Sequence, residues 1–236
     1  MADQQTVIDR MQALIEQWEQ VSDRRAEFLQ CYRLMTSSML VAIDAGEFHD
    51  ATWVAALLHH FAEYYFVALE DYQHKSAGIP AAWQFAFDKA TQDDVLILQN
   101  LLLGINAHIN YDLVLALVDM LEPEWEGLTP ERRQLRYEDH HHVNDIIGRT
   151  VDSVQDQVVD PALPAMGLVD ALLGPVDEWI DSRTIAHWRE AVWIAAIQML
   201  ESGDEEERQM LRRQVGAEAL RRAQAILAGR NPAALV

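Results

Sequence analysis

Residues 95–118 read VLILQNLLLGINAHINYDLVLALV, and this nearly unbroken apolar stretch decides the fold. As a single helix it would be long enough to cross a lipid bilayer. His108 and Asp112 would then lie near the middle of the membrane, where one aspartate alone costs roughly 3 kcal/mol to insert. The chain has no second stretch of comparable length and hydropathy. A helix that is apolar almost all round is typical of the buried centre of a bundle, so we expect a core helix here.

The rest of the chain is also predicted to be helical. It has 10 glycines and 7 prolines, and no apolar–polar alternation long enough to predict a strand. Asp50 and Thr129 are predicted helix N-caps. The sequence therefore predicts an all-α, single-domain bundle of eight to nine helices across residues 1–236, with 203–230 as a possible semi-independent hairpin. The helices are expected at about 4–20, 23–45, 50–74, 83–87, 91–121, 129–159, 180–200 and 204–228.

The charge balance excludes several kinds of partner. The chain has 18 Lys and Arg against 38 Asp and Glu, which gives a net charge of −20. A field this negative repels phosphates, so we expect neither a nucleic-acid partner nor an anionic membrane surface. Cys31 is the single cysteine, so no internal disulfide can form, and residues 1–5 lack the basic and apolar parts of a signal peptide. These features favour a cytoplasmic protein.

The few polar residues of the core helix fall on two opposite faces when placed at about 100° per residue. One face carries His108 and Asp112, an i,i+4 pair that can share a ligand, and Gly104, which lets another group approach the backbone. Helical zinc sites use this His-x-x-x-Asp geometry, although a buried His–Asp hydrogen bond satisfies the same pattern. The opposite face predicts a structural hydrogen-bonding network and consists of Gln99, Asn106 and Asn110.

A second polar cluster lies at residues 138–145, EDHHHVND, in the helix expected at 129–159. On a helical wheel His140 falls within the apolar stripe and Asn144 at its edge, whereas His141 falls on the solvated face. His140 and Asn144 are therefore predicted to face inward, with Arg136 on the same side. A core-edge histidine bonded to a carbonyl is the alternative for His140.

The helix at 50–74 offers further potential metal ligands. His59, His60 and Glu63 are the first of these. Nearly the only polar residues of this helix share one face of roughly 60°, which is either a solvated face or part of a carboxylate-rich metal site: His59, Glu63, Glu70 and His74. A ferritin-like di-iron centre needs two Glu-x-x-His motifs, and the chain has one, from Glu138 to His141. It also lacks a Gly-rich phosphate loop, a Cys-x-x-Cys pair and a Gly-x-Ser-x-Gly elbow.

The segment from Leu101 to Leu113, LLLGINAHINYDL, resembles the signature of an uncharacterised family of bacterial helical proteins. The resemblance extends over about Gly46 to Asp156. That family has no assigned activity, so the resemblance implies a helical fold and adds weight to particular positions. The positions that carry it are Gly46, Glu47, Phe48, Asp50, Trp53, Phe61, Ala62, Tyr65, Pro80, Trp83, Phe87, Gly104, Asn106, Ala107, His108, Asn110, Asp112 and the region of Asn144.

The His-x-x-x-Asp pair is also similar to part of the zinc-dependent phospholipase C and single-strand nuclease architecture. Those enzymes use several such pairs and an N-terminal Trp ligand. This chain has no Trp at its start, and its second inward pair is His140-x-x-x-Asn144. The similarity is therefore an analogy of geometry alone.

Two hypotheses of different classes follow, both with a small-molecule ligand. In the first, the protein is a metal-dependent hydrolase in which zinc, manganese or iron activates water. Without a metal, His108 held by Asp112 would act as a general base. The residues expected to carry this chemistry are His108, Asp112 and Asn144 as catalytic groups, His108, Asp112, His140, His59 and His60 as metal ligands, and Arg136 and Tyr111 as substrate-binding groups.

In the second hypothesis the protein is a non-enzymatic ligand-binding or interaction module. The same His, Asp and Asn side chains would then form a structural polar network. The Arg-rich segment 208–222 could support a homo-oligomer.

Overall fold

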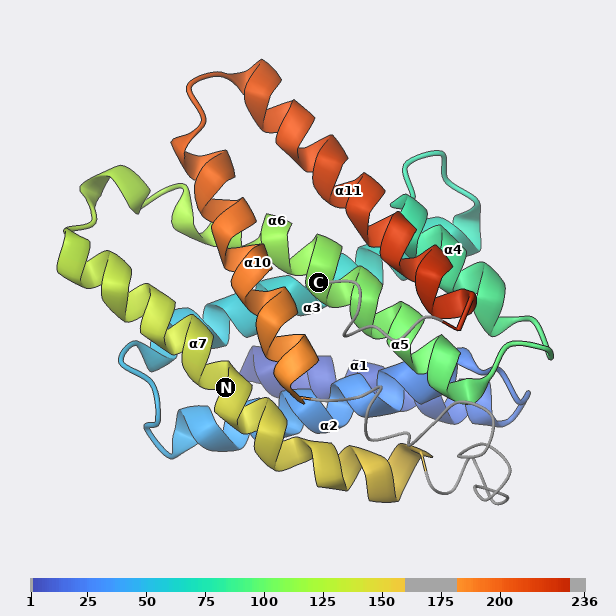
Figure 1. The fold of residues 1–236 in the computed structure, drawn as a ribbon. Coiled ribbons are helices and arrows are strands. Elements are labelled where there is room, and N and C mark those ends of the chain that lie inside the picture. Colours follow the sequence, from blue (N-terminus) through green and yellow to red (C-terminus); the bar gives the residue numbers. More distant parts are fainter. Residues whose placement is uncertain (1, 160–181, 230–236) are drawn as a thin grey trace.

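The computed structural model describes residues 2–159 and 182–229. Within these ranges the chain forms nine α-helices and no strand, which confirms the predicted all-α class (Figure 1). Three short helical turns accompany them: η1 (His108–Asp112), η2 (Trp125–Gly127) and η3 (Gln155–Val159). The helices are α1 (Ala2–Glu19), α2 (Arg25–Asp44), α3 (Ala51–His74), α4 (Ala81–Ala90), α5 (Ile97–Ala107), α6 (Leu113–Leu121), α7 (Pro130–Val154), α10 (Ser182–Glu201) and α11 (Glu205–Leu227).

Side-chain caps mark where several helices begin. Asp50, Thr129 and Asp204 each accept a hydrogen bond from the backbone N–H three residues later, at the starts of α3, α7 and α11. Helix α5 begins at Ile97, later than the expected 91, because residues 91–96 form turns. Local hydrogen bonding near the chain breakers therefore sets these helix ends.

The predicted core helix lies at the centre of the bundle as α5, η1 and α6 (Figure 1). It packs against α2, α4 and α11 through α5, and against α3 and α10 through α6. Within the described ranges, residues 97–121 form the one helix long and apolar enough to cross a membrane, and 89% of its most apolar window is buried inside the protein. The other helices of the chain therefore cover this apolar surface.

A π-helical turn, η1, interrupts the core helix at His108–Asp112. The N–H of Leu113 bonds the carbonyl of His108, five residues earlier, so the turn contains one more residue than an α-helical turn. A helical wheel drawn at 100° per residue does not predict this π turn. Single π turns within α-helices often occur at functional sites. Here the two principal site residues, His108 and Asp112, are the first and last residues of the turn.

Side-chain amides on one face of the core helix form hydrogen bonds with α11. Gln99 donates to carbonyls in the last turn of α11, and Asn106 Nδ2 donates to the Ala219 carbonyl at 2.8 Å. Asn110 donates to Asn106 and accepts from Arg222 of α11. These contacts form the structural hydrogen-bonding network that was predicted for this face.

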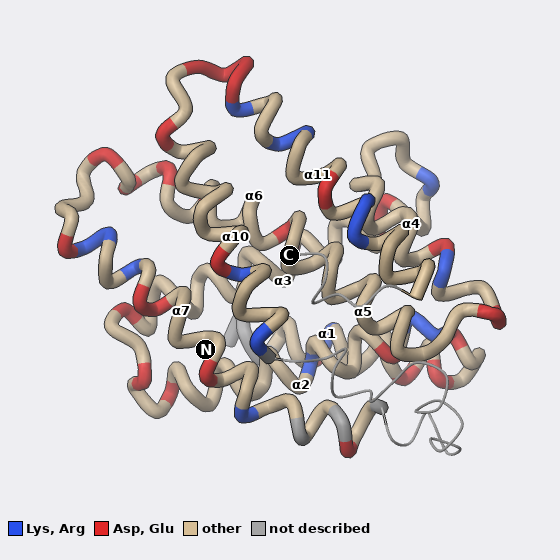
Figure 2. Tube along the Cα trace, viewed as in Figure 1, with Lys and Arg blue, Asp and Glu red and all other residues tan. Residues whose placement is uncertain are grey.

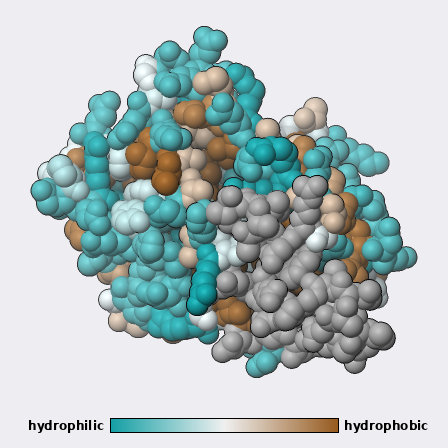
Figure 3. Space-filling view, viewed as in Figure 1, coloured by the Kyte–Doolittle hydropathy of each residue, from teal (hydrophilic) through white to brown (hydrophobic). Residues whose placement is uncertain are grey.

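Charged residues lie mainly on the helices and loops around the α5–α6 core, which itself carries few of them (Figure 2). The face shown in Figure 3 is mostly hydrophilic, with apolar atoms gathered between α10 and α11. Ile194 and Met210 are among the exposed large apolar residues of these two helices. The net charge of −20 is thus mainly a property of the surface.

Candidate functional site

A partly open cavity of about 140 Å³ lies between α2, α3, the α5–η1 junction, α7 and α10. Its lining is almost entirely apolar. The titratable side chains that reach it from the core helix, α7 and α10 are His108, Asp139, His140 and Arg189. The apolar lining includes Tyr32, Met35, Leu58, Phe61, Ile105 and Val143.

His108 and Asp112 form a buried hydrogen-bonded pair in η1. The Nδ1 atom of His108 lies 2.9 Å from Oδ2 of Asp112, and the indole N–H of Trp83 donates to the same oxygen at 2.8 Å. His108 is 3% exposed and Asp112 is 1% exposed. Among the described residues, Nε2 of His108 and Oδ1 of Asp112 have no hydrogen-bond partner. Because Nδ1 is bonded to Asp112, Nε2 is the nitrogen that His108 can offer to a ligand.

Aromatic rings hold the imidazole in place. The ring of Phe61 stacks on His108 with centroids 3.6 Å apart and planes 7° apart, and the edge of Tyr32 approaches at 4.3 Å. Phe28 lies 6.0 Å away, also edge-on. Gly104 makes room for this arrangement, because a Cβ at this position would come within 2.5 Å of the Phe28 ring. The group that Gly104 admits is therefore an aromatic side chain of the protein itself.

Burial shifts the pKa values of both His108 and Asp112. It lowers the pKa of His108 well below its usual range and raises the pKa of Asp112 well above its usual range. The hydrogen bond from Trp83 acts against this rise in the Asp112 pKa. Burial therefore favours an uncharged carboxyl and an uncharged imidazole in this apolar setting.

On the α7–α10 side of the cavity, His140 and Arg189 are bonded to each other. His140 Nε2 donates to the Arg189 carbonyl at 3.1 Å, and Arg189 Nη2 donates to the His140 carbonyl at 2.6 Å. Arg189 Nη2 also lies 3.3 Å from His140 Nδ1, and Arg189 Nε donates to Asn144 Oδ1 at 2.8 Å. Burial, with the nearby Arg189 charge, lowers the pKa of His140 well below its usual range. Both ring nitrogens of His140 are thus engaged by Arg189.

Residues 4–229 match the model of a family described as a family of unknown function, DUF5995. The chain belongs to the DUF5995 family. This membership confirms that the resemblance was to an uncharacterised family, and it assigns no activity. No curated protein and no solved structure matches the chain. The site of this DUF5995 member must therefore be interpreted from its own geometry.

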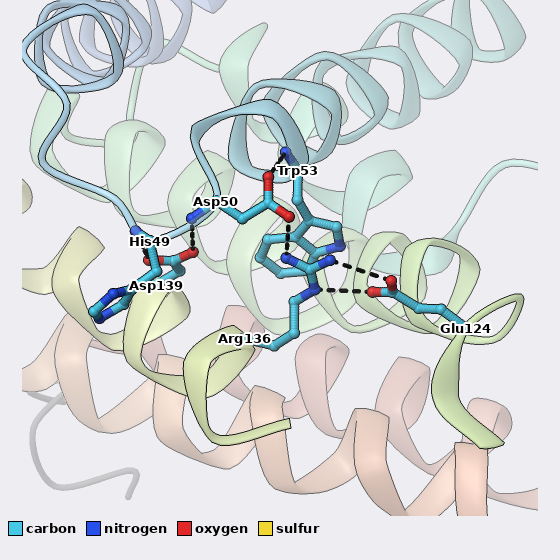
Figure 4. Close-up of polar contacts among 6 residues, drawn as sticks. All are labelled: His49, Asp50, Trp53, Glu124, Arg136 and Asp139. Carbon is cyan, nitrogen blue, oxygen red and sulfur yellow. Dashed lines mark hydrogen bonds and ion pairs between the residues drawn. The ribbon is translucent and has the colours of Figure 1, made fainter. Parts of the chain in front are cut away.

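Arg136, expected to bind substrate, is held by two carboxylates in this DUF5995 protein. Its guanidinium donates to Asp50 at 2.7 Å and to Glu124 at 2.9 Å, and it lies over the ring of Trp53 (Figure 4). The neighbouring Asp139 accepts the backbone N–H groups at positions 49 and 50, which ties the start of α3 to α7 (Figure 4). Arg136 lies outside the cavity lining, and the geometry indicates a structural role.

Arg189 lines the cavity and is not among the site residues expected from the sequence. A signal for it exists in the helical period of α10. Ile185, Arg189, Val192 and Ala196 follow one another at spacings of four, three and four residues, and all four are buried. The sequence feature that indicates a buried arginine is thus its position within an apolar stripe of α10.

The remaining expected site residues lie away from His108. His60 Nε2 is 2.8 Å from Asp119 Oδ2 at the surface, and neither His59 nor His60 lines the cavity. Tyr111 lies beside Gly216 of α11, in a surface depression. Within residues 2–159 and 182–229, no three His, Cys, Asp or Glu side chains are grouped closely enough to hold one metal ion.

Proposed function

We propose that the protein binds a small, mostly apolar molecule in this cavity and recognises one oxygen of that molecule through His108 Nε2. The observation that carries this proposal is the buried Nε2 atom of His108, which lacks a partner among the described residues and belongs to a side chain of the cavity lining. A buried polar atom without a hydrogen bond costs about 1–3 kcal/mol. A ligand that supplies the partner recovers this cost, whereas an empty cavity does not.

The size of the cavity limits the ligand. A volume of about 140 Å³ is close to that of an engineered apolar cavity of about 150 Å³ that binds benzene. The aromatic and aliphatic lining suits a ring or a short branched chain. The proposed ligand is therefore about the size of a substituted benzene.

The proton balance of the pair indicates what the ligand must offer. A buried pair without a neighbouring cation is most stable with no net charge. The shared proton can lie on the Asp112 carboxyl, which then donates it to Nδ1, or it can have moved to Nδ1 of the ring. In both arrangements Nε2 carries a hydrogen. His108 then acts as a hydrogen-bond donor, and the ligand supplies an acceptor such as a carbonyl oxygen.

The metal-dependent hydrolase remains a separate prediction. It would require a metal ion at His108 and Asp112, with Nε2 free of hydrogen. Elemental analysis of protein purified without a His tag distinguishes the two functions. The ligand-binding proposal predicts no stoichiometric zinc, manganese or iron, whereas a stoichiometric metal that is lost in His108→Ala would favour the hydrolase.

Calorimetric titration with two probes of similar shape tests the proposal. Acetophenone has a carbonyl oxygen, and cumene replaces it with a methyl group. We expect acetophenone to bind about tenfold more tightly, which corresponds to about 1.4 kcal/mol, the upper range of one net hydrogen bond. His108→Phe keeps a ring in the aromatic stack and should abolish this preference.

His60→Phe is the matched control, because His60 lies outside the cavity lining. It should leave the preference for acetophenone unchanged. Equal binding of the two probes by the wild-type protein, or an unchanged preference in His108→Phe, would contradict the proposal.

A further inference from the structure

Arg189 differs from the other inward-turned arginines in its partners. Arg136 is paired with Asp50 and Glu124, and Arg222 is hydrogen-bonded to the carboxylate of Glu218. Arg189 is 5% exposed, and no carboxylate of the described residues forms an ion pair with it. Its positive charge is thus buried without a counter-charge from the part of the chain that the structure describes.

The contacts that Arg189 does make are to neutral atoms. Nε donates to the side-chain oxygen of Asn144, and Nη2 donates to the carbonyl of His140. Burial lowers the pKa of Arg189 to about 9, so the guanidinium remains protonated at neutral pH. Removing a charge from water without pairing it is costly, and neutral acceptors compensate for only part of that cost.

The place of Arg189 connects it to the proposed ligand. Its side chain lines the same cavity as His108, and no other arginine or lysine of residues 2–159 and 182–229 does. Asp139 also lines the cavity, but its two oxygens already accept the backbone N–H groups at positions 49 and 50. The cavity lining therefore combines apolar side chains, the imidazole of His108 and one guanidinium that forms no ion pair with a carboxylate of the described residues.

We propose that the ligand of this cavity is a small organic acid whose carboxylate is bound by Arg189 and whose apolar body fills the cavity. This inference rests on the proposed function, since it names the chemical class of the molecule held at the same site. A guanidinium and a carboxylate match in geometry and form strong, charge-assisted hydrogen bonds. A phosphate would carry more negative charge than the one arginine of the described lining can neutralise.

The test compares benzoate with benzamide, which have nearly the same shape and differ in charge. At pH 7 the wild-type protein should bind benzoate at least tenfold more tightly than benzamide in a calorimetric titration. Arg189→Gln keeps an amide near Asn144 and removes the charge, so this ratio should fall to near one. Binding of neutral acetophenone should change by less than about threefold in this variant.

Two further variants serve as controls. Arg222→Gln removes a half-buried arginine that lies outside the cavity lining, so it should leave the benzoate preference intact. Arg189→Lys retains the positive charge and should keep a preference for benzoate. If Arg189→Gln does not fold, the wild-type ratio and Arg189→Lys still decide the question.

The outcomes separate this inference from the function on which it rests. If the wild-type protein binds acetophenone but binds benzoate no more tightly than benzamide, the organic-acid inference is wrong and the ligand cavity stands. If benzoate preference survives in Arg189→Gln, another group binds the carboxylate and the inference is also wrong. If none of the probes binds, both proposals fail.

Discussion

At the scale of single residues, Gly104 shows how tightly the aromatic wall around His108 is packed. A Cβ at this position would come within 2.5 Å of two atoms of the Phe28 ring. Gly104→Ala should therefore lower the free energy of unfolding by about 1–3 kcal/mol in urea denaturation. Gly148→Ala, in α7, adds a Cβ that meets nothing within 4 Å and should stabilise the protein by up to about 1 kcal/mol. Equal effects of the two substitutions would contradict this packing.

Glu27 on α2 predicts a pH dependence of stability. Its Oε2 atom is buried and has no hydrogen-bond partner among the described residues, and burial raises the pKa of Glu27 from 4.5 to about 7, although Arg24 acts in the opposite direction. Since the folded-state pKa lies above the unfolded value, the folded protein takes up a proton. This contribution to stability is present below about pH 4.5 and is lost as the pH rises through about 7.

Glu27→Gln removes this ionisation and should become more stable relative to the wild-type protein as the pH rises from 5 to 8. Urea unfolding at several pH values measures the difference. Glu126→Gln, at an exposed position, should show no such trend. A stability difference for Glu27→Gln that stays constant with pH would rule out the buried carboxylate as its cause.

At the scale of elements, the contact between α5 and α11 depends on side-chain amides of the core helix. Asn106→Ala removes the hydrogen bonds to the Ala219 carbonyl and to Asn110. We expect the free energy of unfolding to fall by about 1–3 kcal/mol and the amides of α11 to exchange faster with deuterium. Gln209→Ala, which removes an exposed hydrogen bond within α11, should have almost no effect. Unchanged exchange in Asn106→Ala would show that other contacts hold α11.

The sequence was sufficient to predict most helices, because few breakers interrupt the chain and the capping residues are recognisable. It was insufficient to predict the π turn. Because the core helix is apolar on nearly all sides, one additional residue in a turn does not change its apolar–polar pattern. The wheel indicated that His108, Asp112 and His140 face inward, and all three are at most 3% exposed. It did not indicate which groups lie opposite them. The facing groups depend on how helices distant in sequence pack together, as the hydrogen bond between Arg189 and the His140 carbonyl shows.

At the scale of the whole molecule, the acidic surface and the apolar cavity are separate features. The bundle covers a central helix of membrane-spanning length, and its charges lie mostly outside (Figure 2). The cavity lies where the π turn of that helix faces α2, α3, α7 and α10. The net charge is therefore a property of the surface, whereas the proposed recognition of a ligand rests on a few polar atoms around the cavity.

The most direct test of the central claim is a crystal structure of the protein with acetophenone bound. We predict that the phenyl ring lies in the cavity beside Phe61 and that its carbonyl oxygen is about 3 Å from His108 Nε2. An empty cavity at saturating acetophenone would contradict the account. So would a bound molecule whose oxygen lies away from His108.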